Sequence, residues 1–223
     1  MTQRREFLRQ ASLIAAGSLA ATSLDAQGAP AAPGAPAQPT NTYDMSWVDR
    51  VTGRYRMAFD SPEISDGTSL HQVRSFLAGY AAVYGLTDAD LSAVLVIRHT
   101  AVPMVLGDAL WADGMFGEAQ KLKDPESGEV AKRNPFIKIP AGARFGTSWP
   151  DGALDTLMSR GVIVLACDLA LRNVTGMIAN ARKIPRQDAA NLVTEHLLPG
   201  VYRMPTGVFA TCRAQAAGCG VMH

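Results

Sequence analysis

The chain has 223 residues, of which 48% are hydrophobic and 18% are charged. This hydrophobic content excludes disorder as the main state, and the length provides one domain of ordinary size. Lysine and arginine total 21 against 20 aspartate and glutamate residues, so the formal net charge is +1. Such a balance argues against a nucleic-acid partner or an anionic membrane surface held by bulk charge.

Residues 1–27 have the three-part pattern of a twin-arginine signal peptide. The pair Arg4 and Arg5 lies in a basic segment, an apolar stretch follows over 11–22, and small residues continue towards Ala26. The apolar stretch is too short to cross the roughly 30 Å hydrocarbon core of a bilayer. We therefore expect export by the twin-arginine route, cleavage of the signal, and a periplasmic mature protein without a membrane partner.

Residues 28–44 follow as a linker rich in proline and alanine. Within it, 28–40 reads GAPAAPGAPAQPT, and proline at this density favours an extended tether without a core of its own. The folded domain is therefore expected over 45–223.

The domain alternates short apolar runs with segments of helical periodicity. The runs 93–97 and 162–166 are apolar on both faces, as parallel strands covered by helices require. Further strands are expected at 54–59 and 201–204, and helices at 70–83, 169–183, 187–198 and 208–217. Asp168 is expected to cap the helix 169–183, and 201–204 to be the last strand. This order predicts an α/β fold with three layers, α/β/α, around a mainly parallel central sheet.

A long insertion at about 114–150 interrupts this alternation. It contains proline turn signals at 124–128, 134–135 and 140–142, with one candidate strand at 136–139. Loops of this length in compact domains are usually functional or disordered. Aromatic residues within and beside it favour a loop that packs down as a lid; they are Trp111, Phe116, Phe136, Phe145 and Trp149.

Two candidate catalytic residues follow the apolar runs. Cys167 comes directly after 162–166, where a helix begins, and His99 closely follows 93–97. Open α/β sheets bind ligands at the carboxyl ends of their strands, and helix N–H groups there favour a thiolate. His99 would serve as a base or a hydrogen-bond donor. The ligand pocket is expected to include Asp168, Trp111 and Arg172, under the long loop.

Each of these residues also has a structural interpretation. Cys167 is compatible with a small buried side chain that fills space beside the sheet, and the Asp168 carboxylate opposes a second negative charge there. A histidine at a strand end is more often a hydrogen-bonded structural residue. An odd count of three cysteines leaves at least one thiol unpaired or bonded to another molecule. The pairing of Cys212 and Cys219 stays open.

Five segments carry a resemblance to a known family. They are Gly161–Arg172, with a strand, a cysteine and a helix start, and Val94–His99, Leu198–Val201, Met204–Val208 and Gln215–Gly218. Their order and spacing resemble DsrE/DsrF-like proteins, the sulfur-relay fold that includes the TusD type, over roughly residues 54–218. The resemblance implies a parallel-sheet α/β domain that assembles into homo-oligomers, trimers or hexamers, with persulfide sulfur carried at Cys167. The export signal, the insertion and the two C-terminal cysteines depart from the family pattern.

Two functions from different classes are therefore expected. The first is thiol or persulfide sulfur chemistry at Cys167, with a sulfur donor as ligand, as the resemblance implies. The second is a non-catalytic periplasmic module that binds a small ligand or a partner. The sequence contains no Walker loop, GxSxG elbow, HExxH motif or GxGxxG after a strand, so no cofactor and no metal are expected.

Export by the predicted route depends on the arginine pair. We expect the double change Arg4→Lys and Arg5→Lys to leave uncleaved precursor in the cytoplasm, because the twin-arginine machinery recognises the pair directly. Fractionation and immunoblotting of cytoplasm and periplasm measure this. Undiminished mature protein in the periplasm would contradict the prediction.

Overall fold

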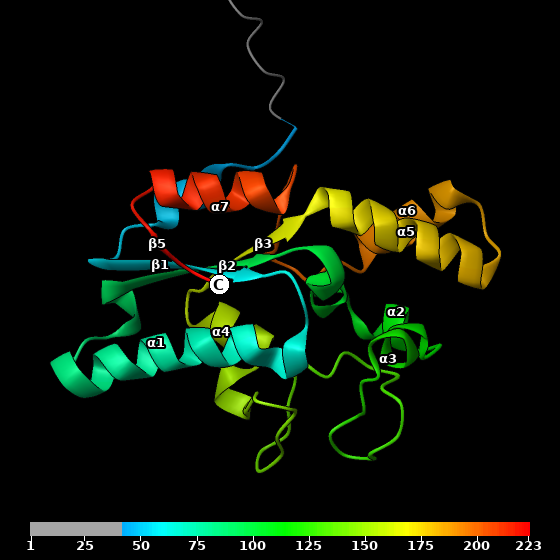
Figure 1. The fold of residues 1–223 in the computed structure, drawn as a ribbon, viewed down its shortest axis with the longest axis horizontal. Coiled ribbons are helices and arrows are strands. Elements are labelled where there is room, and N and C mark those ends of the chain that lie inside the picture. Colours follow the sequence, from blue (N-terminus) through cyan, green and yellow to red (C-terminus); the bar gives the residue numbers. More distant parts are fainter. Residues whose placement is uncertain (1–41) are drawn as a thin grey trace, which may run out of the picture. The chain divides into compact units, whose positions relative to one another are not determined.

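A five-stranded parallel sheet forms the centre of the domain, in the strand order β4-β3-β2-β1-β5 (Figure 1). The computed structural model describes residues 42–223, and the expected signal peptide at 1–27 and linker residues 28–41 lie outside the described residues. The strands are β1 Tyr55–Ser61, β2 Leu91–Ile97, β3 Ile163–Cys167, β4 Tyr202–Met204 and β5 Gly220–Met222.

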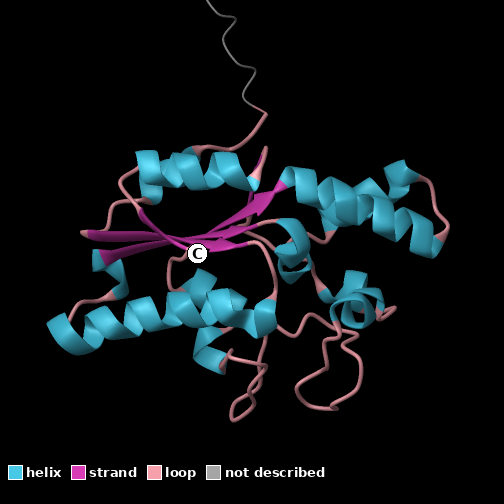
Figure 2. Ribbon diagram, viewed as in Figure 1, coloured by secondary structure: helices cyan, strands magenta, loops and turns pink. Residues whose placement is uncertain are grey.

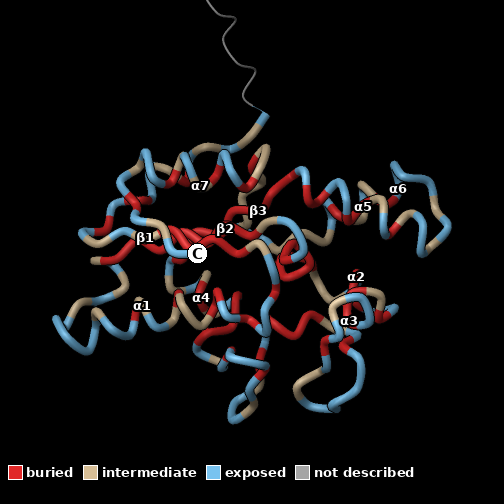
Figure 3. Tube along the Cα trace, in the orientation of Figure 1, coloured by how far each residue is buried: buried red, intermediate tan, exposed pale blue. Residues whose placement is uncertain are grey.

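The two continuous apolar runs form neighbouring central strands. Every residue of β2 and β3 is buried (Figure 3), and the strands pair in parallel with Val94 opposite Ile163 and Ile97 opposite Ala166. Val164 belongs to the hydrophobic core on one face of the sheet and Leu165 to the core on the other. Both faces of these strands therefore require apolar side chains, as the sequence predicts.

Helices cover both faces of the sheet and complete three layers (Figure 2). The α-helices are α1 Thr68–Tyr84, α2 Asp108–Trp111, α3 Met115–Gln120, α4 Leu154–Ser159, α5 Asp168–Arg182, α6 Arg186–Glu195 and α7 Gly207–Ala216. Short 3₁₀ helices lie at Ser46–Arg50, Ser65–Gly67, Asp88–Asp90, His99–Val105 and Pro150–Gly152. Buried residues of α1 to α6 share one core with one sheet face, whereas α7 and Ser46–Arg50 share the other core. The predicted three-layer α/β class with a parallel sheet is confirmed.

Helix α1 shows how local sequence produces these elements. Leu70, Val73 and Leu77 are buried at the spacing of one helix face. Gly85 ends the helix with a φ of +65°, a left-handed conformation that favours glycine, and its N–H donates to the Ala81 carbonyl at 2.9 Å. Across residues 42–223, no helix combines the length and the apolar character that a membrane span needs.

The connections that leave β3 and β4 lie on opposite faces of the sheet. After β3 it enters α5, whose buried residues lie in the core shared with α1, and after β4 it enters α7 on the other face. Strands β1 to β4 advance in one direction across the sheet, whereas the connection from β4 to β5 returns past β1. Right-handed crossovers therefore place the returning helix on the opposite face. The carboxyl ends of β3 and β4 form a topological switch point, where open α/β sheets bind ligands.

The insertion at 114–150 packs down on the face of the sheet that α1 covers. Phe116, Phe136 and Phe145 are buried there. The N–H of Thr147 donates to the Asp66 carbonyl at 2.9 Å, and the N–H of Leu154 donates to the Phe136 carbonyl at 2.7 Å. The insertion is thus tied to the start of α1 and to α4.

Three expectations about local structure are wrong. The segment 136–139 is not a strand, because the N–H of Phe136 donates to the Asn134 side chain at 2.9 Å and that of Lys138 to the Asp155 carboxylate at 3.2 Å. Strand β5 follows α7, so 201–204 is not the last strand. Asp168 does not cap α5, because Cys167 is the N-cap residue and the Asp168 carboxylate is used in ion pairs.

Candidate functional site

Charged side chains gather at the carboxyl ends of four neighbouring strands. Asp60 belongs to β1, Arg98 follows β2, Asp168 follows β3, and Arg203 belongs to β4. Because the strands are parallel, these ends meet at one edge of the sheet. Each of the two aspartates is joined there to an arginine from the next strand.

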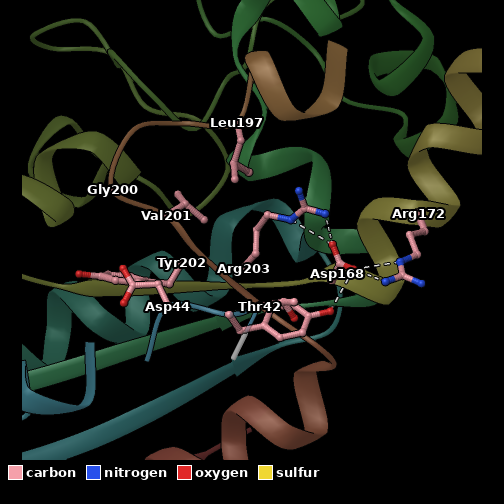
Figure 4. A pocket seen from close by; sticks show the side chains of 10 residues that line it. Thr42, Asp44, Asp168, Arg172, Leu197, Gly200, Val201, Tyr202 and Arg203 are labelled. Carbon is pink, nitrogen blue, oxygen red and sulfur yellow. Dashed lines mark hydrogen bonds and ion pairs between the residues drawn. The ribbon is translucent and has the colours of Figure 1, made fainter. Parts of the chain in front are cut away.

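The carboxylate of Asp168, the first residue of α5, joins three parts of the chain (Figure 4). Its Oδ1 accepts hydrogen bonds from Nε of Arg203 at 3.0 Å and from Nη2 of the same side chain. Its Oδ2 accepts from Nε of Arg172, one helical turn along α5, at 2.9 Å, and from the Tyr43 hydroxyl at 3.4 Å. Asp168 is only 2% exposed, so these donors replace the water that its carboxylate loses.

The two arginines keep the Asp168 carboxylate charged. Burial by itself would raise the pKa of Asp168, because it disfavours the ionised form. The hydrogen bonds and positive charges of Arg203 and Arg172 outweigh burial, so the pKa of Asp168 lies below its ordinary value. At neutral pH an ionised carboxylate therefore holds two guanidinium groups at the switch point.

A pocket of about 780 Å³ lies beside these ion pairs, along the edge strand β4 (Figure 4). Its wall combines charged, hydroxyl-bearing and apolar side chains. The lining residues are Thr42, Tyr43, Asp44, Asp168, Arg172, Leu197, Gly200, Val201, Tyr202 and Arg203. A few converging polar groups in a partly apolar hollow of this size are typical of small-molecule sites. We call it the Asp168 pocket.

A second ion pair joins the ends of β1 and β2. Arg98 donates to the Asp60 carboxylate from Nε and from Nη2, both at 2.7 Å. Burial would raise the pKa of Asp60, but the hydrogen bonds and charge of Arg98, with His223 at 3.4 Å, lower it below the ordinary value. Gly207 leaves room for this arginine, because a Cβ there would lie 2.4 Å from the Arg98 Cδ.

Cys167 is the N-cap residue of α5, but its thiol is buried. It is 6% exposed, its side chain belongs to the core shared with α1, and it does not line the Asp168 pocket. Hydrogen bonding to Asp60 raises the pKa of Arg98, and the charge of a Cys167 thiolate would add to that effect. Cys167, Cys212 and Cys219 are all free thiols.

The structure brings together only some of the expected site residues. Asp168 and Arg172 line one pocket. His99 is exposed, with a left-handed φ of +51°, whereas Cys167 is buried, so the two side chains do not share an accessible site. Trp111 is fully buried, and its Nε1 donates to the Pro103 carbonyl at 3.2 Å, as a structural residue would. No residue of 114–150 lines the Asp168 pocket, so the insertion is not a lid over it.

Arg203, Tyr43 and Tyr202 belong to the pocket and are missed by sequence reasoning. A signal for Arg203 is nevertheless present in the sequence. Arg203 is the only charged residue of the predicted strand 201–204 and lies close to its carboxyl end, the same kind of position that makes His99 a candidate. Tyr43 lies inside the expected linker 28–44, and the proline- and alanine-rich composition of that segment gives no indication that Tyr43 contacts Asp168. Over residues 42–223, no group of three or more His, Cys, Asp or Glu side chains is placed to hold a metal ion.

Loss of the Asp168 charge is expected to destabilise the fold at neutral pH more than in acid. Asp168→Asn leaves Arg203 and Arg172 without their carboxylate, which costs roughly 2–4 kcal/mol at pH 7. Because the pKa of Asp168 is lower in the folded than in the unfolded chain, its contribution is complete above the unfolded pKa of about 3.9 and disappears as the pH falls through the folded pKa. The difference in unfolding free energy should therefore shrink below about pH 4, as urea denaturation at several pH values measures.

The matched control is Asp188→Asn, which removes the same charge from an exposed position of α6. It should change the unfolding free energy by less than about 0.5 kcal/mol. A difference between wild type and Asp168→Asn that is the same at pH 3 and pH 7 would contradict the role given to the carboxylate.

Comparison of the sequence with models of known protein families finds no match, and comparison with curated protein sequences finds none. A function for this chain is therefore argued from the geometry of the Asp168 pocket and of Cys167.

Proposed function

We propose that the protein is a periplasmic module that binds a small organic anion in the Asp168 pocket without catalysing a reaction. The observation that carries this proposal is the buried Asp168, which holds Arg172 and Arg203 in one wall of a hollow at the switch point. Two guanidinium groups share one carboxylate there, so this wall keeps a net positive charge. Arginines held in a fixed orientation are well suited to bind a carboxylate or another oxyanion.

Both arginines keep donors for a ligand. Asp168 accepts hydrogen bonds from Nε and Nη2 of Arg203 and from Nε of Arg172, and Nη2 of Arg172 is ion-paired with it at 2.8 Å. Within residues 42–223 neither Nη1 group donates a hydrogen bond. Asp44 also lines the pocket, but it is exposed, its carboxylate accepts from the Ser46 N–H at 2.9 Å, and it lies apart from Arg172 (Figure 4). Asp44 and Arg172 are both exposed, whereas Arg203 is half-buried, so solvent screens the charge of Arg203 less than that of Asp44.

The remaining wall fits a hydrocarbon or aromatic body. Leu197 and Val201 contribute apolar side chains, and Tyr43 and Tyr202 contribute rings with hydroxyl groups. A volume of about 780 Å³ lies within the range of ordinary small-molecule sites. The ligand class that matches both walls is a small molecule with an apolar body and an anionic end.

The resemblance described above extends the proposal to family, export and assembly. We propose an exported DsrE/DsrF-like domain that reaches the periplasm by the twin-arginine route and forms a homo-oligomer. The parallel α/β sheet over the resembling segments is compatible with this assignment. A monomer in light scattering at micromolar concentration would contradict the assembly.

Thiol chemistry at Cys167 is the second candidate function. The observation that favours it is the position of Cys167 as the N-cap residue of α5, because the unpaired N–H groups of a helix N-terminus favour a thiolate. In a persulfide transfer the Cys167 thiolate would attack the outer sulfur of a persulfide donor. A Cys167 persulfide would form, and the donor would leave as a thiolate. Burial of Cys167 is the reason for placing this candidate second.

Ligand binding in the Asp168 pocket is tested with a small-molecule extract of the periplasm. The purified protein is incubated with the extract and washed by ultrafiltration, and the compounds released on denaturation are identified by mass spectrometry. We expect the wild type to retain an anionic compound and Tyr202→Ala to retain at least tenfold less, because one wall of the pocket is removed. Arg203→Gln should show a similar loss, because it removes one guanidinium group.

The matched control is Tyr84→Ala, which makes the same truncation at an exposed position at the end of α1. It should retain the compound as the wild type does. Retention of no compound by the wild type, or equal retention by Tyr202→Ala, would overturn the proposed function.

Alkylation separates the two candidate functions. With iodoacetamide on the folded protein we expect Cys212, which is exposed, to react first, and Cys167 to react only after unfolding. Peptide mass spectrometry over a time course measures both rates. Faster labelling at Cys167 than at Cys212 would favour thiol chemistry over the non-catalytic module.

A further inference from the structure

A second hollow, of about 500 Å³, lies between α5 and α6. Its polar lining comes from Arg172 and Thr175 of α5, Arg186, Gln187 and Thr194 of α6, and Arg203 of β4. Arg172 and Arg203 also line the Asp168 pocket, whereas Arg186 does not. We call this hollow the α5–α6 groove.

The groove has an excess of positive charge. Three arginines line it, and none of its lining residues among 42–223 is acidic. The Asp168 carboxylate pairs with Arg172 and Arg203, so one negative charge faces three guanidinium groups. An anion in the groove would reduce the repulsion among them.

Arg186 is held in place by the backbone of α5. Its Nη2 donates to the Arg172 carbonyl at 3.1 Å. Gly176 lets the side chain approach closely, since a Cβ there would lie 3.3 Å from Nη1 of Arg186. Two of the three guanidinium groups are thus oriented by Asp168, and the third by a carbonyl group of α5.

The start of α6 adds a partial positive charge. Helix α6 has ten residues and begins at Arg186, directly after Pro185. Arg186 and Gln187, which line the groove, are therefore in its first turn, where N–H groups lack partners in the helix. Asp188 of the same turn does not line the groove. Guanidinium groups held in a fixed orientation are donors that proteins use for phosphate.

We propose that the α5–α6 groove binds a compact tetrahedral oxyanion, phosphate or sulfate, either free or as the end group of a small molecule. This site goes beyond the proposed function, because it needs Arg186 and does not use the aromatic and apolar wall of the Asp168 pocket. Thr175 and Thr194 direct their hydroxyl donors to carbonyl groups of their own helices, at 2.9 and 3.0 Å. The arginines are therefore the main donors to the oxyanion.

Calorimetric titration with sodium phosphate, at low ionic strength and in a buffer without oxyanions, tests the groove. We expect the wild type to bind one phosphate per chain and Arg186→Gln to bind it at least tenfold more weakly. Arg186 is exposed, so this change should leave the thermal melting curve unaltered. The matched control is Arg213→Gln in α7, which lowers the net charge equally outside the groove and should leave the affinity unchanged.

Absence of phosphate binding to the wild type, or the same loss in Arg213→Gln as in Arg186→Gln, would overturn the proposal. Titrations with sodium sulfate and with a phosphate monoester, glucose 6-phosphate, separate the sources of the oxyanion. Tighter binding of the monoester than of inorganic phosphate identifies an end group of a small molecule, and equal or weaker binding identifies a free oxyanion. Tyr202→Ala should keep its phosphate affinity, so failure of the groove and failure of the Asp168 pocket are distinguishable.

Discussion

The ionised carboxylate of Asp168 is the group on which the rest of the candidate site depends. It joins α5 to β4 through Arg203 and also holds Arg172 of its own helix, from a position that water hardly reaches. Strand β4 has three residues and, in the part of the chain that the structure describes, pairs only with β3, so few backbone hydrogen bonds hold this edge of the sheet. The ion pairs supply a side-chain connection where the backbone connection is short. The same two guanidinium groups then form the wall that the Asp168 pocket and the α5–α6 groove have in common.

A similar arrangement recurs at the ends of β1 and β2, with a different consequence. Arg98 pairs with the buried Asp60 in both hydrogen bonds, and Gly207 at the start of α7 leaves space for its side chain. The Arg98 guanidinium is held against the buried Asp60 and does not line the Asp168 pocket or the α5–α6 groove, whereas Arg172 and Arg203 border both hollows. One ion pair therefore joins the ends of two central strands, and the other forms part of the wall of two hollows.

The sequence predicts the strands and helices whose hydrophobic pattern is long, and it is less successful for segments of three or four residues. The two apolar runs and the helical spacing of α1 predict strands and a helix that the structure contains. Strand β5 is not predicted, because it has only three residues, which are exposed or half-buried and follow closely after a turn at Gly218. The segment 136–139 is apolar enough for a strand, but side chains of Asn134 and Asp155 take its backbone N–H groups.

The candidate site is predictable only in part, because its partners are distant in sequence. Asp168 and Arg172 are four residues apart on one helix, so their proximity follows from helix geometry. Arg203 lies 35 residues after Asp168 and Tyr43 lies 125 residues before it. Pairing of β4 with β3 brings Arg203 to the carboxylate, and Tyr43 reaches it from a segment outside the sheet. Trp111 shows the reverse case: an aromatic residue beside a long loop suggests a ligand wall, but burial and the Pro103 carbonyl account for it.

The position of Arg172 and Arg203 between two hollows has a thermodynamic consequence. An anion in the Asp168 pocket that accepts hydrogen bonds from these guanidinium groups leaves fewer of their donors for an anion in the α5–α6 groove. The two occupancies are then linked, and the factor by which an oxyanion in the groove alters the affinity of the pocket equals the factor by which the pocket alters the affinity of the groove. Because both anions would compete for the same donors, each would lower the affinity for the other. Binding of one anion would then favour release of the other.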